Sequence, residues 1–320
     1  MAAKSGPVSV VVAGEALVDL VPATSTTGEA ALVPRPGGSC FNVAVGLGRQ
    51  RVGVAFLSRL STDVFGESLR SELEASGVRS DYLMVADDPS TIVVASVDAE
   101  GVPSYAIRSS GTADRELRPE HLNALPDGGE LPPGAALHFG SMAMGQEPQA
   151  STIEGIVLRE AGRRLISFDP NIRSSVVEDA DRYRERMTGW LACCDLVKVS
   201  TEDLAWFAPD RSPHEVARAW ADAGPAIVVV TDGGKGASAL VAGQEVHVEA
   251  PPVDVVDTIG AGDAFSSGML TWLHDRGALA PDAVRASSAD DVREMVRFAI
   301  GIASDTCTRP GAQPPWREPA

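Results

Sequence analysis

The sequence contains few cysteine and aromatic residues. Among 320 residues there are four cysteines, five tryptophans, three tyrosines and eight phenylalanines. The cysteines are Cys40, Cys193, Cys194 and Cys307, and no C-x-x-C pair occurs, so neither a disulfide framework nor a zinc site is indicated. Small and aliphatic residues dominate instead, which is typical of helices packed closely on a buried parallel sheet.

Basic residues and long apolar runs are also scarce. The 27 Lys and Arg residues face 44 Asp and Glu residues, giving a formal net charge of -17, which disfavours a nucleic-acid backbone binder. The first apolar run, residues 8–13, is too short for a signal-peptide core, and no run reaches the roughly 18 apolar residues of a membrane-spanning helix. We therefore expect a cytoplasmic protein without nucleic-acid or membrane partners.

The apolar pattern predicts an α/β fold. Short apolar runs of strand length alternate with amphipathic segments of helix length, which is typical of a three-layer αβα sandwich with a mostly parallel central sheet. We expect one domain over residues 1–320. The expected strands are residues 8–13, 54–58, 136–139, 165–168, 196–199 and 227–231, and the expected helices are residues 42–50, 65–76, 151–163 and 213–223.

Two segments depart from this alternation. Residues 90–109 alternate like a hairpin that turns at residues 99–101, and residues 17–34 follow the first strand without helical spacing. We expect residues 15–36 and 90–112 to form a small β lid over the carboxyl edge of the sheet, where ligands of such folds bind. Apolar residues of this lid, such as Val93, suggest that two copies pair into a homodimer through it.

The strongest chemical signal is the segment "VDVVDTIGAGDAFSSGML", residues 253–270. Gly260, Ala261 and Gly262 precede an apolar helix, and the first amides of a helix have no internal partner, so they attract an anion. Asp263 places a proton acceptor beside that anion, as phosphoryl transfer to a hydroxyl requires. A short Gly-x-Gly-Asp pattern alone is also compatible with an ordinary helix start.

The longer patterns carry a resemblance. The run "DTIGAGDAF" resembles, position for position, the second signature of the ribokinase-like (PfkB) family of carbohydrate kinases, D-T-x-G-A-G-D-x-F. The segment "RPGGSCFNVAVGLGRQ" resembles the first signature of that family. There, Gly37 and Gly38 would let the backbone approach a polyhydroxy ligand, and the Asn42 amide would bind its hydroxyls. Cys40 stands where a smaller residue is usual.

Further segments resemble the family in the same order along the chain. "GEALVD" resembles the segment whose aspartate, here Asp19, binds sugar hydroxyls, and "FDPNIR" resembles a segment in which Arg173 would lie near the phosphates. In "KVSTED", the magnesium-organising N-x-x-E motif is replaced by Ser200-x-x-Asp203, with Glu202 as an alternative carboxylate. Each short segment by itself is also compatible with a turn or cap.

The resemblance also implies nucleotide and cation sites. "TDGGKGA", residues 231–237, resembles the turn that contacts the nucleotide phosphates, and "SDTCTRPGAQPPW" resembles the loop that encloses a monovalent cation. Oxygen ligands suit a hard cation such as K⁺. Pro315 and Ile300 depart from the residues usual at these positions. The implied cation ligands are the Asp257 side chain and the carbonyls of Ile259, Thr306, Arg309 and Gly311.

The implied activity is transfer of the γ-phosphate of ATP, with Mg²⁺, to a hydroxyl of a small sugar. Residues 105–117 look most like fructokinases, so we expect fructose; the alternative is 2-keto-3-deoxygluconate, whose carboxylate would need a partner such as Arg108. The expected catalytic groups are Asp263, the amides of residues 260–262 and Arg173. The expected substrate-binding residues are Asp19, Gly37, Gly38, Asn42, Arg108 and Asp169, and the expected ATP-binding residues are Lys198, Ser200, Thr231, Gly233 and Gly236.

Two other classes of protein share some of these features. A Rossmann-type oxidoreductase requires G-x-G-x-x-G directly after the first strand, whereas this strand runs into Gly14-Glu15-Ala16. A non-catalytic sugar-binding protein on the same fold would not need both Asp257 and Asp263. Both alternatives therefore fit the residues less well than a kinase.

Overall fold

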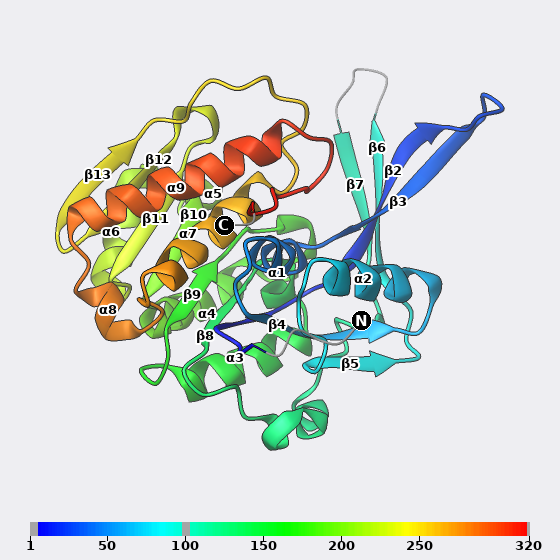
Figure 1. Ribbon diagram of the computed structural model, residues 1–320, viewed down its shortest axis with the longest axis horizontal. Coiled ribbons are helices and arrows are strands. Elements are labelled where there is room, and N and C mark those ends of the chain that lie inside the picture. The colour runs from blue at the N-terminus through cyan, green and yellow to red at the C-terminus, as the bar shows by residue number, and fades with distance from the viewer. Residues whose placement is uncertain (1–5, 98–102, 319–320) are drawn as a thin grey trace.

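The computed structural model describes residues 6–97 and 103–318, which form a large sheet with helices on both faces and a smaller sheet at one side (Figure 1). The large sheet has the order β13-β12-β11-β10-β9-β8-β1-β4-β5, and only β12 and β13 are antiparallel to their neighbours. The expected α/β fold with a mostly parallel sheet is confirmed. Its strands are β1 Val10–Ala13, β4 Val54–Ser61, β5 Leu83–Ala86, β8 Ala136–Gly140, β9 Ile166–Asp169, β10 Leu196–Ser200, β11 Ile227–Thr231, β12 Ala237–Val241 and β13 Gln244–Val248.

The helices form two layers, and each layer packs on one face of the sheet through its own hydrophobic core. Apolar residues of α1, α2, α7, α8 and α9 form one core with one face of the sheet, and those of α3, α4, α5 and α6 form the other. No helix in the described ranges is long and apolar enough to cross a membrane. The helices are α1 Ser39–Arg49, α2 Val64–Ala75, α3 Gln149–Glu160, α4 Ala180–Cys193, α5 Thr201–Phe207, α6 Pro213–Ala223, α7 Ala261–Asp275, α8 Pro281–Arg285 and α9 Ala289–Cys307, with 3₁₀ turns at Pro119–Ala124, Pro126–Gly129, Ser141–Gly145, Ser174–Val176 and Gly233–Lys235.

Most expected elements are present with small shifts at their ends. The strand at Ile227–Thr231 and the helix at Pro213–Ala223 have the expected bounds. Helix α1 begins at Ser39 instead of residue 42, and its N-cap Gly38 has no side chain to signal the start. Helix α4 was not expected, although its buried residues follow the i, i+4, i+7, i+8 spacing of an amphipathic helix.

The smaller sheet has the strand order β3-β2-β6-β7 and projects from the main body (Figure 1). β2–β3 and β6–β7 are antiparallel hairpins, whereas β2 and β6 are parallel. Both expected β segments are therefore confirmed, and the expected turn at residues 99–101 lies outside the described residues. The strands are β2 Leu17–Thr24, β3 Ala30–Gly37, β6 Thr91–Val97 and β7 Pro103–Arg108.

Helices α7 and α9 pack at close range through a glycine. A Cβ atom placed on Gly268 of α7 would lie 2.8 Å from the Cα atom of Ala299 on α9. Real Cβ atoms do not approach a backbone carbon this closely, so the two helices require a glycine at this crossing. This packing holds α7, the helix that follows the Gly-Ala-Gly turn, against the rest of the layer.

We predict that Gly268→Ala lowers the free energy of unfolding by about 1–3 kcal/mol because the added methyl group forces α7 and α9 apart. The matched control is Gly155→Ala on α3, where a Cβ atom meets nothing within 4 Å. The control variant should be neutral or more stable by up to about 1 kcal/mol, since alanine favours a helix. Urea unfolding followed by circular dichroism measures both variants, and equal midpoints would contradict this account of the α7–α9 contact.

Candidate active site

The candidate site lies at the carboxyl ends of the parallel strands. From β1 the chain order runs outward in both directions, with β4 on one side and β8 on the other, and ligands of open α/β sheets bind at such a switch point. Gly140, Asp169, Ser200 and Thr231 end four successive strands at this edge. The fold therefore brings together motif segments that lie far apart in the sequence.

Asp263, the expected catalytic base, is buried in the first turn of α7. Its Oδ1 accepts a hydrogen bond from Ser39 Oγ at 2.6 Å and a longer one from Asn171 Nδ2 at 3.4 Å, while its Oδ2 accepts from Asn42 Nδ2 at 2.8 Å. Burial raises the pKa of Asp263, and the hydrogen bonds from Ser39 and Asn42 oppose that shift. The carboxylate is thus oriented by donors from two other segments.

The glycine-rich turn before α7 forms as expected, with one difference. Gly260 is the N-cap with a φ of 76°, and a Cβ atom there would lie 2.5 Å from the Ala312 Cβ of the final loop. The amide of Ala261 donates to the Thr258 carbonyl at 3.2 Å and so closes the turn. The expectation that this amide binds an anion is therefore not met. The amides of Gly262 and Asp263 remain in the first turn, where a helix has unpaired donors.

A buried ion pair lies directly beneath this first turn. Lys198 Nζ on β10 and Asp169 Oδ2 at the end of β9 are 2.9 Å apart. A Cβ atom on Gly262 would lie 2.9 Å from Lys198 Nζ, so glycine at this position makes room for the ammonium group. Burial alone would lower the pKa of Lys198, but the charge of Asp169 outweighs it and the pKa is raised. The positive charge is therefore fixed close to the expected anion site.

The expected sugar-binding residues Asp19, Gly37 and Gly38 meet at the base of the smaller sheet. Burial raises the pKa of Asp19 to about 6, against the lowering effect of Arg173. A Cβ atom on Gly37 would lie 2.5 Å from Asp19 Oδ2, and one on Gly38 would lie 2.9 Å from the Glu15 carbonyl. Gly38 is thus required by a close approach of the backbone and by its φ of 108°, whereas Gly37 leaves room for the Asp19 carboxylate.

Glu15 is a site residue that the motif comparison did not single out. Its buried carboxylate accepts from the backbone amides of Ser39 at 2.7 Å, Cys40 at 3.4 Å and Ala143 at 3.3 Å. Burial raises the pKa of Glu15 to about 7, while these amides act in the opposite direction. Glu15 supplies the N-terminal cap that Gly38 lacks, and the only sequence signal was an acid directly after the first strand.

Asn171 and Arg173 reach the site from the loop after β9. Arg173 Nη1 donates to Asn171 Oδ1 at 2.6 Å, and Asn171 Nδ2 donates to Ser39 Oγ at 2.8 Å. Asn171 has a φ of 36°, a region that asparagine tolerates better than most residues. Arg173 is exposed, and its guanidinium lies close enough to Asp19 to lower the pKa of that carboxyl.

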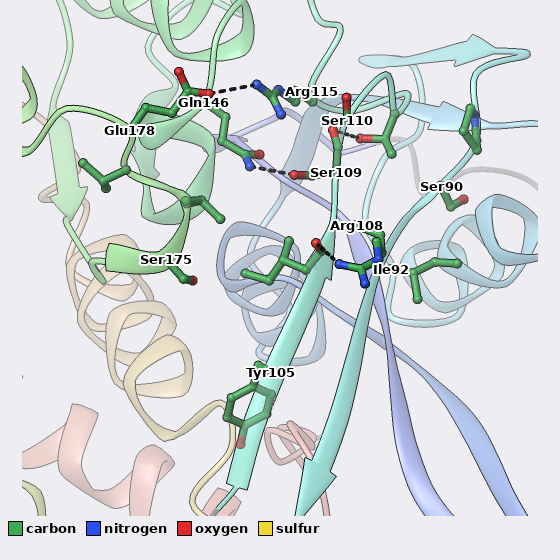
Figure 2. Close-up of a pocket in the computed structure, with 15 residues that line it drawn as sticks. Ser90, Ile92, Tyr105, Arg108, Ser109, Ser110, Arg115, Gln146, Ser175 and Glu178 are labelled. Atoms are coloured by element: carbon green, nitrogen blue, oxygen red, sulfur yellow. Dashed lines mark hydrogen bonds and ion pairs between the residues drawn. The ribbon is translucent and has the colours of Figure 1, made fainter.

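Arg108 lines a pocket of about 750 Å³ together with Ile107 and with Val176 (Figure 2). Asp19, Val93 and Ile107 are paired in register across β2, β6 and β7, so their side chains share one face of the smaller sheet. Side chains alternate along a strand, so Arg108 points to the opposite face. The pocket lies along the free edge of β7 and is also lined by Ser90, Tyr105, Ser109, Arg115, Gln146 and Glu178.

The expected nucleotide residues gather at the ends of β10 and β11. Gly233 has a φ of 49° and open space around it, as a phosphate-binding turn requires. Gly236 differs, because a Cβ atom there would lie 2.1 Å from the Val248 carbonyl, which makes it a packing requirement. Thr231 Oγ1 donates to the Val199 carbonyl at 3.4 Å at the same edge.

The carboxylate of Asp203 is already engaged within the protein. Ser200 and Asp203 form a capping box at the start of α5, and Asp203 Oδ1 accepts from the Ile172 amide at 2.8 Å. Burial raises the pKa of Asp203. Glu202, by contrast, is exposed. In the described ranges, no group of three or more His, Cys, Asp and Glu side chains is arranged to hold a metal ion.

Asp257 joins the two segments that supply the expected cation ligands. Its Oδ1 accepts from the Ile259 amide at 3.0 Å, and its Oδ2 accepts from the Gly311 amide at 2.8 Å. Thr306 is buried at the end of α9, and the Arg309 amide donates to its carbonyl at 3.2 Å. The structure thus brings the expected oxygen ligands into one region beside Gly260.

A buried carboxylate at a helix N-terminus, with a fixed ammonium beneath it and a glycine-rich turn beside it, fits phosphoryl transfer to a hydroxyl. The fold and the site together define a kinase of the ribokinase-like class.

Comparison with known proteins assigns the family. The model of the pfkB family carbohydrate kinases matches residues 8–319. A fructokinase of Rhizobium leguminosarum bv. trifolii is 38% identical over 260 residues, covering 81% of this chain and 78% of the relative. A fructokinase of Klebsiella pneumoniae is 37% identical over 303 residues, covering 90% and 94%. The chain belongs to the pfkB family of carbohydrate kinases.

A solved structure supports the same assignment. The crystal structure of a double mutant of the Vibrio cholerae O395 fructokinase, with fructose, ADP and potassium ion bound, is similar to this fold with a TM-score of 0.80. The two chains are 28% identical, and the similarity covers 97% of this chain and 95% of the other.

We predict that Lys198→Met destabilises the protein by about 3–5 kcal/mol, because it leaves the Asp169 carboxylate buried without its counter-ion. The control is Lys235→Met, which removes the exposed partner of Asp232 and should change stability by less than about 0.5 kcal/mol. Thermal and urea unfolding of both variants measure the difference. A Lys198 variant as stable as the Lys235 variant would show that the buried ion pair has no structural role.

Proposed function

We propose that the protein is a fructokinase that transfers the γ-phosphate of ATP to the terminal hydroxyl of fructose. The observation that carries the proposal is the position of Asp263, a buried carboxylate beside the first amides of α7. The similarity to fructokinases over most of the chain supports fructose as the sugar.

In the proposed reaction, Asp263 accepts the proton of the sugar hydroxyl as the oxygen attacks the γ-phosphorus. Asp19, Asn42 and the backbone at residues 37–38 bind the remaining hydroxyls. The amides of Gly262 and Asp263, the Lys198 ammonium and the Arg173 guanidinium stabilise the charge on the transferred group. Asp169 holds Lys198 in place through a buried ion pair. We therefore assign Asp169 to this ion pair and not to direct binding of the sugar.

The nucleotide would lie over the ends of β10 and β11, with Thr231 and Gly233 near its phosphates. Magnesium would neutralise charge on these phosphates. Glu202 is the better candidate to organise its water ligands, because it is exposed while both Asp203 oxygens are hydrogen-bonded within the protein.

A monovalent cation of the K⁺ type would be held near Asp257 by this carboxylate and by the carbonyls of Ile259, Thr306, Arg309 and Gly311. Oxygen ligands of this kind suit such an ion, which would fix the final loop against Gly260. Each Asp257 oxygen already accepts one backbone hydrogen bond, so the ion would use the remaining lone pairs of this carboxylate.

The smaller sheet would act as a lid that excludes water when sugar is bound. Val93, expected to be exposed for pairing with a second copy, is instead buried against Leu17 and Met142. The homodimer stays a proposal that rests on the free edge of the outer strand β7. Kinase domain and lid together form one functional unit over residues 1–320.

We predict that Asp263→Asn keeps the fold and binds fructose but loses turnover by about 10²–10⁴-fold, because the amide cannot accept the proton. The control is Asp210→Asn at an exposed position, which should leave turnover unchanged. A coupled assay of ADP production measures both variants. Near-normal turnover of the Asp263 variant would remove the base assignment, and absence of ATP consumption in the wild-type protein would favour a non-catalytic sugar-binding protein.

We predict that kcat/KM is higher for fructose than for ribose or 2-keto-3-deoxygluconate when the three sugars are compared side by side. Because Arg108 points away from the face of the lid that carries Asp19, Arg108→Ala should change the rate with fructose by less than about threefold, about 0.7 kcal/mol. A preference for the keto acid that disappears in Arg108→Ala would instead establish the alternative substrate.

A further inference from the structure

We propose that Ser39 is a positioning residue for the transfer reaction: its hydroxyl is the last link of a hydrogen-bond chain that connects Arg173, through Asn171, to the base Asp263. This inference rests on the proposed function, since it assigns a role to a residue that acts through the proposed base. Ser39 belongs to the segment between the glycine pair and Asn42, to which the motif comparison gave no role of its own.

The three links of this chain have the same direction. Arg173 Nη1 donates to Asn171 Oδ1 at 2.6 Å, Asn171 Nδ2 donates to Ser39 Oγ at 2.8 Å, and Ser39 Oγ donates to the carboxylate at 2.6 Å. The hydroxyl hydrogen has no alternative direction here, because an ionised carboxylate only accepts and the amide nitrogen only donates. Hydrogen bonds aligned in this way polarise one another, so a cationic end strengthens the bond at the anionic end.

Ser39 is held rigidly enough to serve as such a link. Its backbone amide donates to Glu15 Oε1 at 2.7 Å, its side chain is mostly buried, and it is the first residue of α1. The backbone of Ser39 is therefore fixed from one side and its hydroxyl from the other.

The chain leaves the two oxygens of Asp263 in different surroundings. Oδ1 faces Ser39 and Asn171, whereas Oδ2 receives only the Asn42 amide in the described structure. Asn42 is also an expected sugar ligand, so Oδ2 is the oxygen that a sugar hydroxyl reaches together with Asn42. Ser39 thereby orients the carboxylate so that the other oxygen faces the substrate.

Hydrogen bonds to a carboxylate favour its ionised form, so the loss of the Ser39 hydroxyl should raise the pKa of Asp263 further. Other groups that act on this carboxyl stay in place in a Ser39 variant, so the change is attributable to the hydroxyl. The charged or titratable groups around it are Asp19 of β2, Cys40 of α1, Asp169 of β9 and Lys198 of β10. Arg173, in the loop after β9, reaches it through Asn171.

The test is the pH dependence of kcat/KM for fructose in Ser39→Ala. We expect the acidic limb to move to higher pH by about one unit, and kcat at the optimum to fall about tenfold while KM changes little. Ser39→Thr retains a hydroxyl and should keep the wild-type limb to within about 0.3 unit. The control is Ser76→Ala, a buried serine whose carbonyl lies against Gly48 at the far end of α1.

A second variant tests the chain itself. Asn171→Gly removes the middle link without strain, because Asn171 has a positive φ. It should shift the limb in the same direction as Ser39→Ala but by less. The double variant should shift little further than Ser39→Ala alone, because the direct hydrogen bond from Asn171 to Asp263 is long, at 3.4 Å, and the shorter route runs through the Ser39 hydroxyl. This measurement also decides the matter if Ser39→Ala does not fold.

The outcomes separate this inference from the proposed function. If the wild-type protein phosphorylates fructose but the limb of Ser39→Ala coincides with that of Ser76→Ala, Ser39 is only a helix-start residue and the inference is overturned. Additive shifts of the two single variants would overturn the chain while leaving a direct role for each residue. If the wild-type protein phosphorylates no sugar, the proposed function fails first.

Discussion

The candidate site holds several buried carboxylates close together, at the start of α7 where we propose that a phosphate binds. Asp169, Asp203 and Asp263 act on the same buried ammonium group, that of Lys198, so negative charge outweighs positive charge before a phosphate arrives. Uncompensated buried charge is costly, and it persists only where hydrogen bonds replace the lost hydration. Each of these aspartates except Asp169 has donors on both oxygens, and Asp169 has the ion pair with Lys198.

This requirement explains why uncharged donors surround the site. Hydroxyl, amide and backbone donors stabilise a carboxylate without adding full positive charge, so an incoming anion is not trapped in a permanent ion pair. Glu15 shows the same solution at the neighbouring helix start, where backbone amides and the Ser141 side chain surround a buried acid. The exposed Arg173 is different: it adds its charge at the open side, where the nucleotide phosphates would enter.

The sequence predicted those parts of the site that depend on local pattern. The Gly-Ala-Gly-Asp turn and the glycine pair before Asn42 are readable because each fixes the backbone within a few residues. Glu15 and Ser39 were missed because their partners are remote; Ser39 and Asp263 are 224 positions apart. Asp203 shows the converse difficulty, since Ser-x-x-Asp is also the pattern of a capping box, and the structure uses it as one.

The position of the base is set by core packing as much as by the glycine-rich turn that precedes it. Helix α7 packs closely against α9 at Gly268 and against α1 at Ser267. At the second contact, a Cβ atom on Gly46 of α1 would lie 2.5 Å from the Ser267 hydroxyl oxygen. Helix α1 carries Ser39 and Asn42, so the same contact that packs the layer also aligns the donors with Asp263. Because both helices lie on the sheet by apolar burial, small residues at their crossing fix the distance between acid and donors more firmly than a flexible loop would.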